Sequence, residues 1–184
     1  MDAQKAGRLA LLTAATGFLV GAALLNGGSS NAIGGLCNGG PASHTWLDAS
    51  GQYGPALIDG TDGDDGIIGS DGDDVIDAGA GNDVVCGAAG DDLIDGGDGD
   101  DVVRGDTGDD DVFGGAGVDT VSGDGGNDTV SGGDQYDIQL GGAGDDVLIA
   151  RDSDGANDDL YAGDGFDVCL LGEGGDEPRP DCEY

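Results

Sequence analysis

The sequence predicts an all-β fold, a parallel β-solenoid of short stacked strands, and three observations carry this prediction. First, residues 60–149 divide into ten consecutive nonapeptides without an insertion or deletion. Second, the sixth residue of every unit is aspartate. Third, the eighth residue is a branched aliphatic side chain in nine of the ten units. A fixed period of this kind indicates a repeat architecture in which each unit packs against its neighbours.

Two further units follow a three-residue interruption at Ala150 to Asp152, and they run from Ser153 to Tyr161 and from Ala162 to Leu170. The sixth column, meaning the sixth residue of each unit, therefore contains twelve aspartates in phase: Asp65, Asp74, Asp83, Asp92, Asp101, Asp110, Asp119, Asp128, Asp137, Asp146, Asp158 and Asp167. The fourth column is glycine in nine of the ten unbroken units: Gly63, Gly72, Gly81, Gly90, Gly99, Gly108, Gly117, Gly126 and Gly144.

This spacing predicts the local structure of a unit. Three residues centred on an inward aliphatic side chain form a minimal strand, and six Gly- and Asp-rich residues form a turn. Stacking such strands about 4.8 Å apart also stacks the turns, so carboxylates of successive layers approach each other. Two carboxylates about 4 Å apart repel by roughly 4 kcal/mol at an effective dielectric near 20. We therefore expect cations between the turns.

The expected ligands are all oxygen atoms, from the aspartate carboxylates and from the carbonyls of a glycine-rich turn. Such a set suits calcium, with its flexible coordination by six to eight oxygens, better than octahedral magnesium or thiophilic zinc. The sequence thus predicts multiple bound calcium ions, with the sixth-column aspartates and the fourth-column glycines as the site residues.

The columns resemble the G-G-x-G-x-D-x-U-x nonapeptide of RTX proteins, also known as hemolysin-type calcium-binding repeats. The resemblance covers 111 of the 184 residues. It implies a parallel β-roll, a right-handed β-solenoid in which successive strands alternate between two sheets and calcium lies between turns two units apart. Carried onto this chain, it pairs Asp65 with Asp83 and Asp83 with Asp101 on one edge, whereas Asp74 and Asp92 belong to the other edge.

Composition limits the function classes. The chain has room for one domain, but 42 glycines and few aromatic residues cannot build an ordinary large core, so bound ions must supply stability. The formal charge is −34, and it comes from 39 acidic residues. This negative field argues against nucleic acid or an anionic membrane as a partner.

The N-terminal residues 1–32 resemble a secretory signal peptide. Lys5 and Arg8 precede an apolar run, and Ser30-Asn31-Ala32 provides a small-x-Ala cleavage site. We expect cleavage after Ala32, a secreted protein and no membrane insertion after cleavage. The alternative is an uncleaved membrane anchor, because seventeen apolar residues reach the lower limit for spanning a bilayer.

The flanks of the repeats, residues 33–59 and 171–184, are expected to cap the ends of the solenoid, residues 60–170. Ala56-Leu57-Ile58 reads as the strand of an incomplete first unit. Pro178 and Pro180 predict that the tail cannot continue a strand. Ser43-His44 contains the only histidine and has no nucleophile motif around it, so we expect no enzyme activity.

Four cysteines in a chain with a predicted signal peptide indicate disulfides, and three pairings are possible. We favour Cys169 with Cys182, because the short segment between them closes back easily, which leaves Cys37 to meet Cys86. Free buried thiols are the alternative.

The unit from Gly132 to Leu140 breaks the pattern. Gln135 stands in the glycine column and Gln139 stands in the aliphatic column. Either the buried amide finds turn carbonyls, or the register slips so that Ile138 and Leu140 point inward. Both outcomes predict weaker calcium sites at Asp137, and we expect the interruption after Ile149 to disturb them further.

The seventh column is unexpectedly apolar, at Val75, Val84, Leu93, Val102 and Val147, which indicates either β-propensity or a docking face.

We therefore expect a small exported form of RTX protein without an effector domain, with a structural or cell-surface interaction role and a partner that the sequence does not identify. The alternative is an accessory module or enzyme acting on extracellular polymer. Ice binding is disfavoured, because the third column of the ten unbroken units contains one threonine, Thr107.

Overall fold

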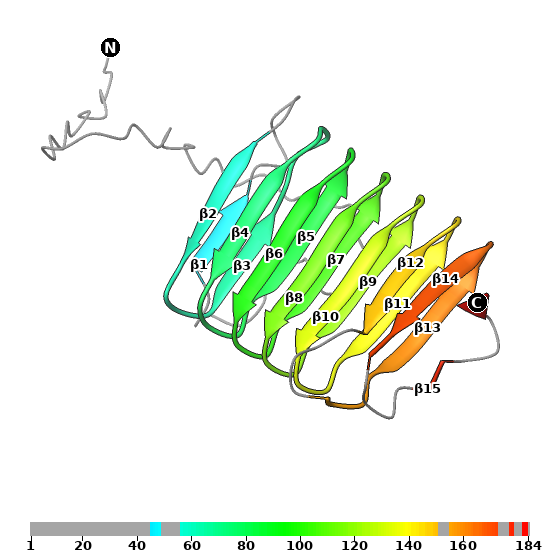
Figure 1. Ribbon diagram of the computed structural model, residues 1–184. Coiled ribbons are helices and arrows are strands. Elements are labelled where there is room, and N and C mark those ends of the chain that lie inside the picture. The colour runs from blue at the N-terminus through cyan, green and yellow to red at the C-terminus, as the bar shows by residue number, and fades with distance from the viewer. Residues whose placement is uncertain (1–44, 49–55, 151–154, 173–176, 179–181, 184) are drawn as a thin grey trace, which may run out of the picture.

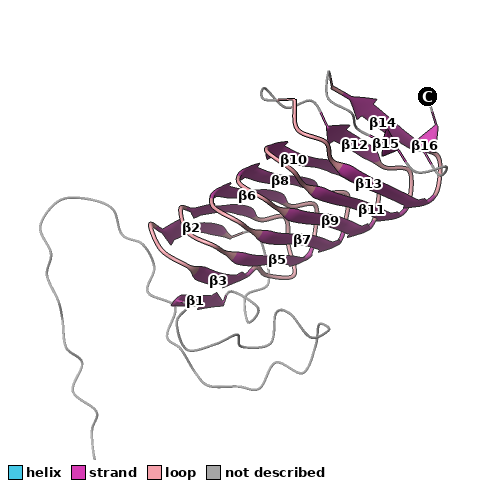
Figure 2. Ribbon diagram, turned by 90° about the horizontal axis from the view of Figure 1, so that it is seen from below, coloured by secondary structure: helices cyan, strands magenta, loops and turns pink. Residues whose placement is uncertain are grey.

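The computed structural model describes residues 45–48, 56–150, 155–172, 177–178 and 182–183. These residues form sixteen strands and no helix. The strands make two eight-stranded parallel sheets that face each other along the length of the molecule (Figure 1). Successive strands alternate between the sheets, and the turns join one sheet to the other (Figure 2). The predicted all-β parallel β-roll is confirmed.

The odd-numbered strands form sheet A, in the order β1-β3-β5-β7-β9-β11-β13-β15. Their bounds are β1 Thr45–Asp48, β3 Asp65–Ile68, β5 Val84–Ala89, β7 Val102–Thr107, β9 Thr120–Gly125, β11 Ile138–Ala143, β13 Asp159–Asp164 and β15 Glu177–Pro178. The even-numbered strands form sheet B, and their bounds are β2 Leu57–Thr61, β4 Val75–Gly79, β6 Leu93–Asp98, β8 Asp111–Ala116, β10 Thr129–Asp134, β12 Val147–Ala150, β14 Asp167–Leu171 and β16 Cys182–Glu183.

The core is the eighth column. Each nonapeptide makes half a turn of the roll, so the in-register neighbour of Val103 on sheet A is Val85 on one side and Val121 on the other. Every eighth-column side chain from Ile67 to Cys169 is at most 5% exposed. Burying an aliphatic side chain of this size contributes about 1.5 to 3 kcal/mol. The core is one side chain wide on each sheet, which agrees with the low aromatic content.

Most strands are longer than the three residues that the sequence predicts. Strands β5 to β11 each contain six residues, because columns one to three continue the ladder after the aliphatic triplet. On sheet B, for example, Gly97 pairs with Gly115 and Asp98 pairs with Ala116. A ladder needs only backbone N–H and C=O groups, which glycine also has. The glycine-rich columns one to three can therefore belong to the strands. The turn shrinks to columns four to six.

The seventh column points outward, as expected. Val75 and Leu93 on sheet B are 45% and 43% exposed. Val84, Val102 and Val147 are half-buried.

Both ends of the roll add strands beyond the repeats. Leu57 and Ile58 lie in β2, as predicted, and Ile58 packs against the core. The structure adds β1, in which Leu47 pairs with Ile67 and so extends sheet A by one layer. Sequence reasoning missed this strand because Leu47 and Ile67 are twenty residues apart, whereas the repeat spacing is eighteen.

The C-terminal tail corrects one expectation. Pro178 does not prevent strand pairing, since β15 pairs with β13 and Leu160 lies beside Pro178. Proline is compatible with this place because β15 is an edge strand, whose free side needs no N–H donor.

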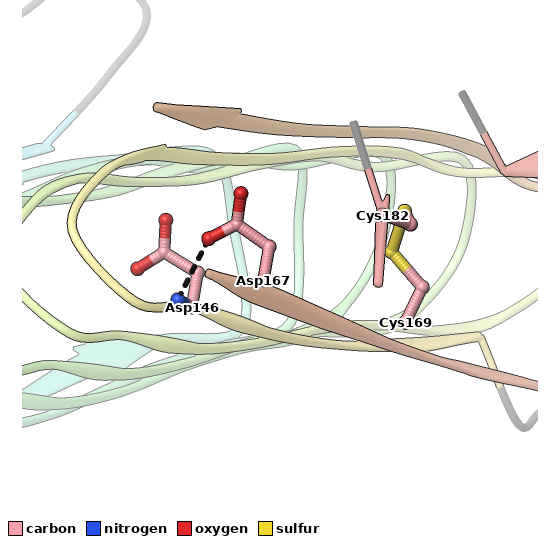
Figure 3. Close-up of a disulfide and its surroundings, with 4 residues drawn as sticks. All are labelled: Asp146, Asp167, Cys169 and Cys182. Atoms are coloured by element: carbon pink, nitrogen blue, oxygen red, sulfur yellow. Dashed lines mark hydrogen bonds between the residues drawn. A yellow bond between two sulfur atoms is a disulfide. The ribbon is translucent and has the colours of Figure 1, made fainter. Parts of the chain in front are cut away.

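Cys169 of β14 forms a disulfide with Cys182 of β16, as predicted, and both cysteines are buried at the end of the core (Figure 3).

Cys86 is also in a disulfide, and no cysteine among the described residues is free. Its expected partner, Cys37, lies outside the described residues. The predicted signal peptide, residues 1–32, and His44 also lie outside them. The alternative of free buried thiols is wrong for Cys86, Cys169 and Cys182.

The ninth unit keeps its register. Gln139 pairs with Val121 on one side and Leu160 on the other, and its side chain points into the core with no exposed surface. Its Nε2 donates to the carbonyl of Ile149 at 3.2 Å. The register therefore does not slip, and the amide bonds to a carbonyl as in the first alternative, although this carbonyl belongs to strand β12 and not to a turn. Ile149 lies next to the interruption, so Gln139 satisfies a carbonyl close to the point where the repeat is broken.

Candidate metal centre

The sixth-column aspartates form two continuous lines, one along each edge of the roll. All twelve are at most 3% exposed. The backbone N–H of each donates to Oδ1 of the aspartate two units later, at 2.7 to 3.0 Å, from Asp65 through Asp146. These bonds join the aspartates in the pairs that the resemblance implies, with Asp65, Asp83 and Asp101 on one line.

The interruption after Ile149 does not break either line, contrary to our expectation. The backbone N–H of Asp137 donates to Oδ1 of Asp158, and that of Asp146 donates to Oδ1 of Asp167, each at 3.0 Å (Figure 3 shows the second pair). The residues of each pair are 21 apart in the sequence instead of 18. The carboxylates therefore stay in phase across the interruption.

The second carboxylate oxygen is the unusual feature. Among the described residues, a buried Oδ2 without a hydrogen-bond partner occurs at Asp92, Asp101, Asp110, Asp119, Asp128, Asp146 and Asp167. A buried polar atom without a partner costs about 1 to 3 kcal/mol, and more if it is charged. Seven in phase are too many to be a packing defect, and this row of buried acceptors fits a cation held between the turns.

Backbone carbonyls converge on the same space. A methyl group placed on the Cα of Gly96 would lie 2.7 Å from Oδ2 of Asp101 and 2.5 Å from the carbonyl oxygen of Gly114. Gly114 has the same surroundings, with Oδ2 of Asp119 at 2.6 Å and the carbonyl oxygen of Gly132 at 2.5 Å. At these two positions the first-column glycine thus leaves room for a group of converging oxygen atoms that a side chain would fill.

The electrostatics of the lines are unfavourable without a cation. Burial, together with a smaller effect of the neighbouring carboxylates, raises the pKa of Asp101, Asp110 and Asp128 to about 7, although backbone hydrogen bonds to these carboxylates lower it. Burial raises the pKa of Asp92 and Asp119 to about 6. At pH 7 about half of the Asp101, Asp110 and Asp128 carboxyl groups are therefore protonated, and a bound cation would displace these protons.

Within the described ranges, no group of three or more Asp, Glu, His or Cys side chains could hold a metal ion. An ion between the turns therefore needs carbonyl oxygens as well as carboxylates. This donor set excludes nitrogen and sulfur, and it fits a hard cation with flexible coordination such as calcium.

The fourth-column glycines shape the turns. From Gly81 to Gly144 they have positive φ, between 120° and 149°. A methyl group on Gly99 would lie 1.9 Å from the carbonyl oxygen of Gly81 in the preceding layer, so these carbonyls also stack along the turns. Gly63 and Gly72 lie in the first two turns, where the hydroxyls of Thr61 and Ser70 accept hydrogen bonds from their N–H groups at 3.3 Å.

Gln135 occupies the same column with φ of 82°. The bond from Gly117 N to Asp134 O, beside this turn, is 3.3 Å, whereas the equivalent bond from Gly99 N to Ala116 O is 2.7 Å. The glutamine is therefore accommodated with a local loosening of the ladder.

Sequence reasoning missed a polar cluster on sheet A. Arg104 contacts Asp106 and Asp124, both of which stand in the second column, where the repeat favours glycine. The departure from glycine was a signal in the sequence, but only the structure shows that these residues meet.

The model of the RTX calcium-binding nonapeptide repeat matches this chain in four overlapping copies, at residues 59–94, 87–112, 104–139 and 122–154. Together the copies span residues 59–154, just over half of the chain. No curated protein matches the chain significantly. No helix in the described part of the chain is long and apolar enough to cross a membrane. The family match and the two lines of buried aspartates agree, and the chain belongs to the RTX family as a calcium-binding β-roll protein.

Proposed function

We propose that this protein is exported, that it folds when calcium binds, and that it has a structural or cell-surface interaction role outside the cell. The observation that carries the proposal is the pair of buried aspartate lines, in which Oδ2 of Asp92, Asp101, Asp110, Asp119 and Asp128 has no hydrogen-bond partner among the described residues. Calcium is scarce in the cytosol and plentiful outside cells, so export would deliver the chain to its ion.

The proposed ligands are the sixth-column carboxylates together with backbone carbonyls of the turns, including those of the fourth-column glycines. Support comes from Oδ2 of Asp101, which has no hydrogen-bond partner among the described residues and faces the space beside Gly96. Oδ1 keeps its bond to the backbone, so one carboxylate can hold both the ladder and the ion.

Isothermal titration of the metal-free exported chain with calcium tests the stoichiometry and the selectivity. Within the ten unbroken units, adjacent turns two units apart offer eight places for an ion. We expect cooperative binding of several ions per chain, and much weaker binding of magnesium, which demands octahedral geometry. A single calcium per chain, or equal affinity for magnesium, would contradict the assignment of the turns.

Export is supported by the composition of residues 1–32. Mass spectrometry of the protein from the culture medium tests it, and a chain that begins at Ile33 is the expected result. An intact chain found only in the membrane fraction would favour the uncleaved anchor instead.

We propose a role without catalysis. Among the described residues there is no histidine, and each described cysteine is in a disulfide. A hydrolase assay on extracellular polymers with and without calcium tests this, and turnover that requires calcium would favour the enzyme alternative.

A further inference from the structure

The second column differs between the two sheets. On sheet B it is glycine in four consecutive strands, at Gly79, Gly97, Gly115 and Gly133, all with positive φ. On sheet A the same column contains Ala88, Asp106 and Asp124, with φ of 90°, 74° and 73°. A residue with a side chain costs roughly 1 to 2 kcal/mol in this conformation. Strained residues of this kind concentrate at functional sites, and here they gather on one sheet.

The two aspartates hold an arginine. Arg104 lies two residues before Asp106 on β7, so both side chains leave the outer face of the sheet. Its Nε donates to Oδ2 of Asp124 at 2.7 Å, and its Nη2 lies 3.1 Å from Oδ1 of Asp106. Ser122 Oγ donates to Oδ1 of Asp124 at 2.9 Å. Two carboxylate oxygens, one from β7 and one from β9, therefore hold the guanidinium, and Ser122 holds the Asp124 carboxylate in turn.

One acceptor in this cluster lacks a partner. Asp106 is 7% exposed, and its Oδ2 makes no hydrogen bond within the described part of the chain. Asp106, Asp124 and Arg104 line a groove of about 570 Å³ at the carboxyl ends of β5, β7 and β9. Its size is within the range of small-molecule sites, roughly 300 to 1,000 Å³. Small residues form much of its wall: Ala88, Ala89 and Gly125.

The charges of the groove restrict its ligand. Asp71, Asp106 and Asp124 outnumber Arg104, and the chain carries −34, so an anion would be repelled. A metal ion is disfavoured because the Arg104 guanidinium already places a positive charge between the two carboxylates. A neutral molecule with several hydroxyl groups fits, because each hydroxyl can donate to a carboxylate and accept from Arg104 or Thr107. Its C–H faces can contact the alanines.

We propose that this groove binds a neutral carbohydrate, one sugar unit of an extracellular polysaccharide. Asp124, whose side chain is 34% exposed, accepts hydrogen bonds from sugar hydroxyls, Arg104 donates to a hydroxyl or ring oxygen, and the buried Asp106 holds Arg104 in place. Glycine in place of Asp106 or Asp124 would supply no carboxylate to the groove. This inference deepens the proposed extracellular interaction role, and it requires only that the roll be folded.

The test uses the calcium-loaded exported chain and a panel of soluble neutral oligosaccharides of glucose, mannose, galactose and N-acetylglucosamine. Asp106→Gly/Asp124→Gly restores the repeat pattern and relieves the strain, so it should fold with calcium at least as well as the natural chain. Arg104→Gln is a second, independent variant. Asp77→Asn/Asp95→Asn removes two exposed carboxylates from sheet B and is the matched control for charge.

We expect at least one oligosaccharide to bind, and both groove variants to weaken its binding at least about tenfold, which corresponds to about 1.4 kcal/mol. The control variant should bind as the natural chain does. Because the ligand is neutral, we also expect its affinity to change little between about 0.05 and about 0.5 M NaCl.

Three results would overturn the proposal: no binding of any neutral oligosaccharide by the folded chain, undiminished binding by the groove variants, or binding only of dextran sulfate or a lysine oligomer. Circular dichroism of the same samples with and without calcium reports separately on calcium-dependent folding. A chain that folds on calcium but fails to bind sugar contradicts the groove assignment alone.

Discussion

A single residue type, aspartate, has two roles at adjacent positions of a unit. Asp110 is 1% exposed and belongs to the edge line, whereas Asp111 begins β8 and is exposed on its outer face. The same side chain is therefore a proposed ion ligand at one position and a solvated surface group at the next. This contrast allows a matched pair of variants.

We predict opposite effects of Asp110→Asn with and without calcium. Without calcium, the variant should be more stable than the natural chain near pH 7, because it removes a carboxyl whose pKa burial raises to about 7. With calcium, it should lose bound ions and require more calcium to fold. Calcium titrations followed by circular dichroism measure both effects. Asp111→Asn should change neither, and a similar shift in both variants would contradict the assignment.

The left-handed turn residue gives a second prediction at this scale. Gln135→Gly should stabilise the calcium-loaded roll by about 1 kcal/mol, because φ of 82° is unstrained for glycine. The reverse change, Gly126→Gln, places a Cβ 1.7 Å from the carbonyl oxygen of Gly108 in the present backbone and should be strongly destabilising. Chemical unfolding at saturating calcium measures both, and equal effects of the two changes would rule out the role assigned to this column.

At the scale of elements, the roll consists of layers that contact mainly their neighbours, so damage should remain local. The last layers are β12, β14 and the two-residue strand β16, which the disulfide between Cys169 and Cys182 attaches to β14. Cys169 also stands in the aliphatic column, so the disulfide replaces core packing at the open end of the roll.

We predict that Cys169→Val/Cys182→Ser loosens this end alone. Valine keeps the core filled, while the loss of a link across 13 residues should cost about 3 kcal/mol of local stability. Hydrogen exchange in calcium should become faster in β14 and β12 and stay unchanged in β4 to β8, which provide the internal control. Faster exchange along the whole roll would show that the layers unfold as one unit.

Sequence columns predicted the regular part of these elements well, because every unit repeats the same pleat and the same turn. They predicted the buried eighth column. With the family resemblance, they also predicted that strands alternate between two sheets and that the aspartates form two lines. They failed where the period fails. Leu47 pairs with Ile67 at a spacing of twenty, and Pro178 pairs as an edge strand, so neither is visible in an eighteen-residue pattern.

The candidate site was predictable to the same extent. Column six identified the aspartates that meet, but a single column cannot show which oxygen of each carboxylate is used by the backbone. Two contacts depend on side chains from different strands: Gln139 bonds to the carbonyl of Ile149, and Arg104 bonds to Asp124. Such contacts depend on side-chain geometry that periodicity does not contain.

At the scale of the whole molecule, the buried carboxylates link folding to pH. Because burial raises the pKa of Asp101, Asp110 and Asp128 to about 7, the folded chain binds more protons than the unfolded chain, whose aspartates titrate near 3.9. This contribution to stability is present below about pH 4 and is lost as the pH rises through about 7.

We predict that the metal-free chain gains β structure when the pH falls from about 8 to about 5, and that calcium binds more tightly at the higher pH because fewer protons compete. Circular dichroism in a chelator and calcium titrations at both pH values measure these effects. Metal-free stability that rises with pH would have the wrong sign. The lower pH of about 5 stays above the isoelectric point of about 4.1, at which the chain would precipitate.

The central claim is that cations replace protons in the two aspartate lines and thereby allow this acidic chain to fold at neutral pH. Far-UV circular dichroism of the exported chain at about pH 7.5, first with a chelator and then with millimolar calcium, tests it most directly. The account predicts a largely unfolded spectrum in the chelator, and a cooperative change to β structure as calcium is added. The same β spectrum in both solutions would contradict it.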